Sequence, residues 1–347
     1  MKSTAAGLMM TKYELPQNFL VTGGCGFLGV NLIARLVEMG CCKIRVVDNL
    51  SVGSKESLGA VCDFIETDEP VPDLDKVELW VGDITDADFA SRAADGMKCV
   101  IHLAANTGVV PSIENPLTDC ENNVIGTLNY LEAARRNGAE KFIFASSGAP
   151  LGEQKPPIDE EKVPRPISPY GASKLAGEGY CSAYYGSFGL KTITLRFGNV
   201  YGPRSNHKGS VVAKFIKQAL RGEPLVIYGD GNQTRDFIYV DDLIDAILSA
   251  AARADIGGEI FQIATHKETT VNEVAIILKT IIEAKTDMTV SLTHADARTG
   301  EIKRNFSDIS KARRLLGWEP SWTLENGLTA TVEWFLNQSD RISSNEQ

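Results

Sequence analysis

Two groups of residues in this chain have the types and the spacing for redox chemistry on an alcohol. Tyr170 and Lys174 are four residues apart, so on a helix they share one face and lie about one turn from each other. Because an ammonium near a phenol favours the ionised phenol, Tyr170 is predicted to act as a base near neutral pH. About 140 residues upstream, Gly23, Gly26 and Gly29 form a glycine-rich loop.

The glycine-rich loop has the sequence context that a dinucleotide requires. It follows a β-rich run at 18–22 and precedes apolar residues with helical spacing at 27–37, and a helix N-terminus with little side-chain bulk accepts a pyrophosphate. Asp48 ends the next strand-like segment, where an acid binds the ribose hydroxyls of NAD and repels a 2′-phosphate. We therefore expect NAD. NADP stays an alternative because three cations lie nearby, Lys43, Arg45 and Lys55.

A serine pair completes the groups that alcohol oxidation needs. Ser146 and Ser147 follow a β-rich segment at 141–145, and ligands bind at the carboxyl ends of parallel strands. Hydride transfer from an alcohol to a nicotinamide requires a hydroxyl to hold the oxygen, a phenol to accept its proton and an ammonium to tune the phenol. The candidate catalytic residues are therefore Ser147, Tyr170 and Lys174.

The elements that must hold these residues alternate along the chain. Strands are expected at 18–22, 43–48, 77–81, 99–103, 141–145 and 191–197, and helices at 27–37, 86–94, 123–136 and from Tyr170 onward, after a proline-rich surface loop at 153–169. This alternation is typical of a Rossmann-type α/β fold with a doubly wound parallel sheet. Later elements, the helices 211–221, 241–253, 271–283 and 310–316 and the strand 225–228, predict a smaller C-terminal α/β lobe for the substrate.

The predicted domain organisation follows from these elements. Residues 1–16 are expected to be a mobile N-terminal extension, and residues 17–190 are mainly the NAD-binding domain, to which the strand 191–197 and the helix 241–253 return. Residues 198–347 are mainly the substrate-binding lobe.

Composition excludes several classes of function. The net charge of −10, from 45 acidic and 35 basic residues, argues against a nucleic-acid-binding protein, which needs a basic face. The seven cysteines and four histidines lack metal-ligand spacing, so we expect no metal and reduced thiols, as in a cytoplasmic protein. No segment has the length of a membrane span, and the apolar N-terminal run is too short for a signal peptide.

A series of motifs runs through the chain in a fixed order. It comprises Thr22-Gly-Gly-Cys-Gly-Phe-Leu-Gly29, Asp48-Asn-Leu-Ser51, Gly82-Asp-Ile84, His102-Leu-Ala-Ala105, Asn122-Asn-Val-Ile-Gly-Thr127, Ser146-Ser147, Tyr170 with Lys174, Leu195-Arg-Phe-Gly-Asn-Val-Tyr-Gly-Pro203, Gly229-Asp-Gly-Asn-Gln-Thr-Arg-Asp236 and Asp308-Ile-Ser-Lys-Ala-Arg-Arg-Leu-Leu-Gly-Trp318. From Phe19 to about Phe335 the chain thereby resembles the extended short-chain dehydrogenases/reductases, in their nucleotide-sugar epimerase/dehydratase branch.

The resemblance implies roles for individual residues. The implied cofactor-binding residues are Gly23, Gly26, Phe27, Leu28, Gly29, Asp48, Asn49, Asp83, Ile84, Leu103, Ala104, Ala105, Asn122, Ser146, Tyr170 and Lys174. Among them, Asp83 and Ile84 flank the adenine, and Asn122 braces the strand end at 103–105. The implied substrate-binding residues are Thr107, Ser147, Asn199, Arg235, Arg298 and Asn305. Asn199, Arg235 and Arg298 hold the substrate diphosphate, and Asn305 is a gate residue beside the sugar C2 group.

The chain departs from the family pattern after the serine pair. Relatives read Ser-Ser-x-x-Val-Tyr-Gly, whereas here Leu151 replaces the tyrosine, which predicts the loss of a substrate contact or of a packing hydroxyl. The 4,6-dehydratases carry Asp-Glu after the catalytic hydroxyl, and decarboxylating relatives carry a glutamate. Gly148 and Ala149 stand there instead and cannot move protons.

These features predict an NAD-dependent 4-epimerase of a UDP-sugar that works through a transient 4-keto intermediate. The expected substrates are UDP-Glc and UDP-Gal, with UDP-GlcNAc and UDP-GalNAc. The alternatives are a dehydratase or an NADPH-dependent reductase of the same branch, and a non-catalytic nucleotide-sensing protein, which would not need the proton relay. The helices near 123–136 and 168–186 resemble the pair that forms a four-helix bundle in homodimeric relatives, although their outward apolar residues fit an intramolecular core equally well.

Overall fold

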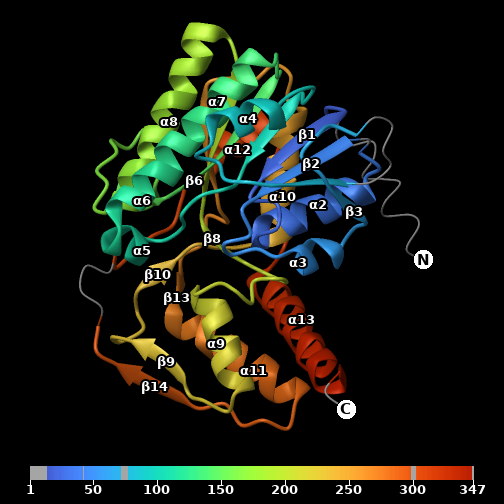
Figure 1. Cartoon of the computed structure of the whole chain (residues 1–347). Coiled ribbons are helices and arrows are strands. Elements are labelled where there is room, and N and C mark those ends of the chain that lie inside the picture. Colours follow the sequence, from blue (N-terminus) through green and yellow to red (C-terminus); the bar gives the residue numbers. More distant parts are fainter. Residues whose placement is uncertain (1–13, 42, 72–76, 298–301, 346–347) are drawn as a thin grey trace.

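The strands at the centre of the protein form one parallel sheet. The computed structural model describes residues 14–41, 43–71, 77–297 and 302–345, with side chains described as far as 338; Arg298 and residues 1–13 of the predicted extension lie outside these ranges. Within them, eight strands are ordered β12-β7-β6-β5-β1-β2-β4-β3. Figure 1 labels β1, β2, β3 and β6 of this sheet. The bounds of the eight strands are β1 Asn18–Thr22, β2 Lys43–Asp48, β3 Phe64–Glu66, β4 Val77–Val81, β5 Cys99–His102, β6 Lys141–Ser147, β7 Lys191–Phe197 and β12 Glu259–Ile263.

Apolar side chains alternate between the two faces of this sheet, and each face is covered by helices. Phe19 and Val21 belong to one core cluster, whereas Leu20 between them belongs to the other. The first cluster includes α2 (Phe27–Glu38) and α10 (Val240–Ala252), and the second includes α4 (Ala87–Ala93), α7 (Gly126–Arg136) and α8 (Pro169–Phe188). Strands buried on both faces are nearly continuous apolar runs in sequence, and the doubly wound α/β fold predicted from the sequence is confirmed.

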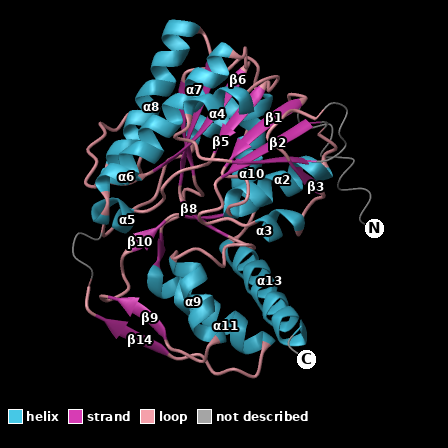
Figure 2. Cartoon of the chain, viewed as in Figure 1, coloured by secondary structure: helices cyan, strands magenta, loops and turns pink. Residues whose placement is uncertain are grey.

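The second lobe lies at one end of the sheet (Figure 2). It contains α9 (Val211–Leu220), α11 (Val271–Lys285) and α13 (Leu324–Asn345), with β9 (Leu225–Tyr228) paired to β14 (Leu292–Ala295). Two short pairs lie at the junction of the lobes, β8 (Asn199–Tyr201) with β11 (Phe237–Tyr239) and β10 (Thr234–Arg235) with β13 (Thr269–Thr270). Among the described residues no helix is long and apolar enough to cross a membrane.

Several elements differ from those predicted. After residue 197, only the helix 241–253 was predicted to belong to the NAD-binding domain. In the structure β12 also pairs with β7 of the main sheet, and α12 (Ser310–Leu316) packs against β12. The polar residues Glu259 and Gln262 within Glu-Ile-Phe-Gln-Ile obscured this strand. A π-helical turn, η1 (Glu121–Ile125), precedes α7, where one continuous helix was expected. Short elements were also missed: α3 (Lys55–Gly59), α5 (Val109–Glu114), α6 (Pro116–Cys120), β3, β8 and β14.

Candidate active site

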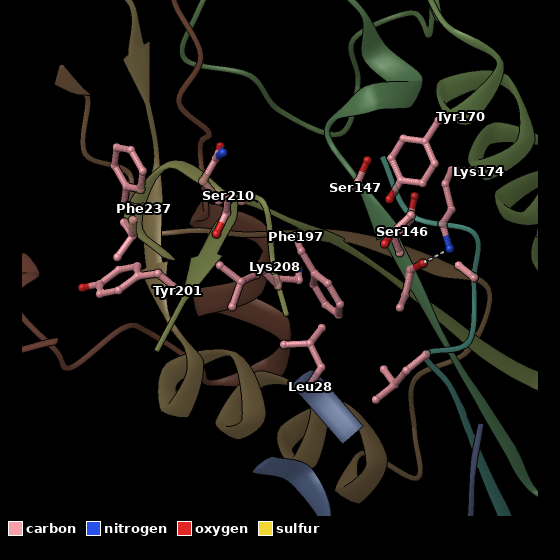
Figure 3. Close-up of a pocket in the computed structure, with 18 of the residues that line it drawn as sticks. Leu28, Ser146, Ser147, Tyr170, Lys174, Phe197, Tyr201, Lys208, Ser210 and Phe237 are labelled. Carbon is pink, nitrogen blue, oxygen red and sulfur yellow. Dashed lines mark hydrogen bonds between the residues drawn. The ribbon is translucent and has the colours of Figure 1, made fainter. Parts of the chain in front are cut away.

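Tyr170 and Lys174 lie on the first turns of α8, and local sequence fixes where this helix begins. The Ser168 side chain accepts a hydrogen bond from Gly171 N (3.1 Å), and a proline occupies the first turn, both of which favour a helix start. A Cβ at Gly171 would lie 2.6 Å from Ala149 O, so only glycine lets α8 pack this closely on the turn η2 (Ala149–Leu151). This contact places Tyr170 beside Ser147 (Figure 3).

The three predicted catalytic residues line one cavity, but their proton affinities differ from the expectation. Burial raises the pKa of Tyr170, and a hydrogen bond with Ser147 opposes the rise. Lys174 Nζ donates to Ala145 O (2.9 Å), and burial lowers the pKa of Lys174 to about 8. The sequence predicted a lowered pKa for the phenol, but the pKa is raised because the phenol is buried and the loss of water disfavours its ionised form.

A buried ionic network supports the wall of the cavity behind Ser146. Ser146 Oγ donates to Glu178 Oε1 (2.6 Å), and Arg196 donates to both oxygens of the same carboxylate, from Nε (2.9 Å) and from a terminal nitrogen (2.7 Å). Glu178 lies one turn after Lys174 on α8, and Arg196 lies on β7. The network therefore fixes the end of β6 relative to the helix that carries the catalytic pair.

The glycine-rich loop forms a cradle at the N-terminus of α2. A Cβ at Gly29 would lie 2.4 Å from Gly23 O, and a Cβ at Gly23 would lie 2.8 Å from Ala104 N. Gly26 caps the helix without a side-chain hydrogen bond, and the first turn carries no acid. The free N–H groups in the first turn of α2 and the positive end of its dipole therefore suit a pyrophosphate. The predicted residues Phe27 and Leu28 lie in this turn, and Leu28 also lines the cavity.

Asp48 ends β2 beside the glycine-rich loop, as predicted. Its two carboxylate oxygens accept hydrogen bonds from Cys25 N (2.9 Å) and Leu50 N (2.8 Å), and burial raises its pKa. Asn49 donates to Asp83 at the next strand end (2.8 Å). These acceptors gather at the carboxyl ends of β2 and β4, where the ribose and base of a dinucleotide lie in a doubly wound sheet.

Ile84 is buried in a position that contacts α7. A Cβ at Gly126 would lie 2.6 Å from the Ile84 side chain, so the chain after β4 is held tightly against that helix. The placement of Ile84 beside the adenine stays a prediction.

The end of β5 is braced by Asn123, not by Asn122. Asn106 N donates to the Asn123 side-chain oxygen (2.8 Å), and the Asn123 amide donates to Asn106 O (3.0 Å). Asn122 donates only to the helix carbonyl of Thr118 among the bonds described (2.8 Å). Asn123 is buried and Asn122 is partly exposed. The signal was present, because Asn123 and Thr127 are four residues apart and share the buried face.

The cavity is lined both by the predicted catalytic residues and by residues predicted to bind substrate. Thr107 and Asn199 line it together with Leu103 and Ala105. Sequence reasoning missed the rest of its second wall, which consists of Phe197, Gly198, Val200, Tyr201, Lys208, Ser210, Val211, Val212 and Phe237. Some of these lie within a motif quoted from the sequence, but Lys208 and Ser210 occupy a loop that had no distinguishing pattern.

Asn305 and Arg235 lie at the junction of the lobes. The Asn305 amide nitrogen is 3.9 Å from the position that a Cβ on Gly148 would take, so it lies next to the residue after Ser147. A guanidinium nitrogen of Arg235 donates to Thr234 O (2.7 Å) and to Ile302 O (2.8 Å). Contacts of both residues with substrate stay predictions.

Leu151 is not among the residues that line the cavity. Its side chain is fully buried, so the leucine that replaces the usual tyrosine belongs to the packing of η2. This burial favours the predicted loss of a packing hydroxyl, and the predicted loss of a substrate contact stays a prediction. Among the described residues no group of three or more His, Cys, Asp or Glu side chains is arranged to hold a metal.

Comparisons with known proteins agree with this geometry. The model of the NAD dependent epimerase/dehydratase family matches residues 19–264. The UDP-glucose 4-epimerase of Mycolicibacterium smegmatis is 37% identical over 325 residues, which cover 92% of this chain and 99% of that protein.

Two solved structures are similar over nearly the whole chain. The UDP-glucose 4-epimerase of Thermotoga maritima, solved with UDP-glucose, has a TM-score of 0.82 at 37% identity, covering 93% of this chain and 99% of that one. The UDP-N-acetylglucosamine 4-epimerase of Methanobrevibacter ruminantium M1, in complex with UDP-N-acetylmuramic acid, has a TM-score of 0.82 at 34% identity, covering 92% and 98%.

Proposed function

Because this chain belongs to the NAD-dependent epimerase/dehydratase family, we propose that it is a 4-epimerase of UDP-sugars. The observation that carries the proposal is that one cavity is lined by Ser147, Tyr170 and Lys174 together with Asn199. Gly148 and Ala149 follow Ser147, so this turn offers no acid or base for the elimination of water. Epimerisation needs only the removal and return of the same hydride and proton, and the residues present suffice for it.

Each catalytic residue has one task in this proposal. The phenolate of Tyr170 accepts the proton of the sugar 4-hydroxyl while Ser147 Oγ hydrogen-bonds the same oxygen. NAD, when bound, supplies the acceptor and the donor of the C4 hydride. The positive charge of Lys174 favours the phenolate, against the burial that raises the pKa of Tyr170. Asn199 and Arg235 hold the diphosphate while the 4-keto sugar turns, so that the hydride returns to its other face.

An absorbance experiment separates this proposal from its alternatives. The purified protein is mixed with UDP-glucose, and the ultraviolet absorbance of reduced nicotinamide is followed together with the sugar products. An epimerase interconverts UDP-glucose and UDP-galactose without net consumption of cofactor. A dehydratase yields a stable dehydrated keto sugar, a reductase consumes added NADPH, and a sensor yields no product. Any of these three outcomes would refute the proposal.

We further propose that N-acetylated UDP-sugars are substrates, because the Asn305 amide lies next to Gly148. An asparagine is smaller than a tyrosine and donates a hydrogen bond, so it leaves room for a 2-acetamido group. Asn305→Tyr is expected to lower kcat/KM for UDP-GlcNAc while kcat/KM for UDP-Glc changes little. An unchanged ratio would remove Asn305 as the gate, and a wild type inactive on N-acetylated sugars would refute the breadth of the substrate range.

The proposed assembly is a homodimer in which α7 and α8 form a four-helix bundle. Ile125 in η1 and Tyr180 on α8 expose their apolar side chains, as a contact with a second copy requires. The mass of the wild type and of Ile125→Asp in solution is measured by light scattering. A monomeric wild type would refute the assembly.

A further inference from the structure

Lys208 lines the cavity, and its ammonium group has no hydrogen-bonded or oppositely charged partner among the described residues. It lies in the loop between β8 and α9 and lines the cavity. Its Nζ is 5.2 Å from the centroid of the Phe27 ring, and burial lowers its pKa. Within the described ranges Nζ has no hydrogen bond or ion pair. A desolvated cation with no counterion is costly, so the position calls for an anionic ligand.

The loop that carries Lys208 is held in place by its own hydrogen bonds. Lys208 N donates to Ser205 O (2.9 Å), and Ser205 Oγ donates to Gly202 O (2.7 Å). Lys217 Nζ from α9 donates to Lys208 O (2.9 Å) and to Asn206 O (3.0 Å). The backbone of Lys208 is therefore held in one position, unlike that of a lysine on a loop without such bonds.

The same loop is joined to the nucleotide-binding lobe at α2. Arg204 donates to the Asn31 side-chain oxygen (2.7 Å), and the Asn31 amide donates to Pro203 O (3.2 Å). Asn31 lies one turn after Phe27. These bonds between the lobes hold the loop so that the Lys208 ammonium lies beside the Phe27 ring, in the first turn of α2, which carries no acid.

The lining of the cavity carries two cations and no acid. Among the residues that line the cavity, the charged side chains are Lys174 and Lys208, and none is an Asp or a Glu. Ser210 Oγ is buried and has no hydrogen-bond partner in the described part of the chain, although Ser210 precedes α9 in the capping position. Figure 3 shows Lys208 and Ser210 across the cavity from Ser147 and Tyr170.

We propose that Lys208 and Ser210 bind a diphosphate that lies between the two lobes. The ammonium pairs with non-bridging phosphate oxygens, and the free hydroxyl donates a hydrogen bond to the same group. Both the cofactor and a UDP-sugar contain a diphosphate. The inference rests on the proposed function and adds to it two ligands that the family motifs in the sequence do not contain.

Variants of the full chain test the pair. Lys208→Met and Ser210→Ala remove the two groups, Lys208→Arg keeps the charge, and Lys214→Met is the matched control. Lys214 lies on the same helix as Lys217, and its Nζ is 3.2 Å from the Tyr228 hydroxyl. The affinity for UDP is measured by titration calorimetry, and the retention of NAD is measured by its absorbance after gel filtration.

The two readouts distinguish the sources of the diphosphate. Because a charge-assisted hydrogen bond contributes to binding, Lys208→Met should lower the affinity for one of the two ligands by about 10- to 100-fold. The loss of affinity should be smaller for Ser210→Ala and absent for Lys214→Met. Loss of UDP binding alone assigns the pair to the substrate, and loss of NAD retention assigns it to the cofactor. If wild type binds both ligands and Lys208→Met equals it, the inference is overturned. If wild type binds neither ligand, the proposed function fails.

Discussion

Replacing Glu178 by glutamine tests the energetic importance of the buried network behind the catalytic pair. The Glu178 and Arg196 side chains are each only 2% exposed. Both carboxylate oxygens accept from the guanidinium, and one also accepts from Ser146. Glutamine keeps the shape of the side chain but removes its charge and turns one acceptor into a donor. Arg196 is then left as an unpaired buried cation.

The expected loss of stability follows from that burial. Removing one partner of a buried ion pair costs about 3–5 kcal/mol, so the free energy of unfolding of Glu178→Gln should fall by that amount. Glu268→Gln is the control, because Arg304 donates to both oxygens of Glu268 with similar distances, 2.6 and 2.7 Å. The Arg304 side chain is 59% exposed, and such pairs contribute about 0–1 kcal/mol.

Urea unfolding followed by tryptophan fluorescence gives both free energies. The double variant Glu178→Met with Arg196→Met removes both charges and should cost less than Glu178→Gln, because no unpaired ion remains. If Glu178→Gln costs no more than Glu268→Gln, burial does not control the strength of this pair, and the account of the network is wrong.

Three further predictions concern the catalytic base, the cofactor and acid stability. Tyr170→Phe should lower kcat by about 10²- to 10⁴-fold while NAD stays bound, as measured by turnover and absorbance; activity within a few-fold of wild type would contradict the mechanism. Asp48→Ala should weaken the binding of NAD and narrow the protein's preference for NAD over NADP, whereas Asp48→Asn keeps an acceptor for Cys25 N. If the alanine variant discriminates between NAD and NADP as the wild type does, Asp48 does not contact the ribose. Burial lowers the pKa of His102 to about 3, so the folded state favours the neutral ring and stability should fall as pH drops below about 6.5. Urea unfolding at several pH values should show a shallower loss for His102→Gln, and an equal slope would exclude His102 as the titrating group.

The parts of the site that sequence predicted are those fixed by local contacts. Gly29 must be a glycine because of Gly23 O, six residues earlier, so the glycine-rich loop was recognisable from its own segment. Tyr170 and Lys174 share a helix, and their spacing alone placed them together.

Other features depend on contacts between distant segments. The direction of the Tyr170 pKa shift was wrong because desolvation depends on the whole cavity wall. Lys208 gave no signal, because its position results from bonds between Arg204 and Asn31, which are far apart in the chain. The family motif predicted Asn122 as the residue that braces the end of β5, whereas the helical spacing from Thr127 favours Asn123.

The return of β12 to the edge of the sheet has a consequence for synthesis on the ribosome. β7 pairs on one side with β6 and on the other with β12, whose residues come more than sixty positions after β7 ends. Until β12 has emerged, β7 presents an unpaired apolar edge, which is a template for aggregation. A fragment that ends after β7 should therefore express as insoluble material, whereas one extended through β12 should stay dispersed for longer. The late segment thus protects a sheet that the early segments begin.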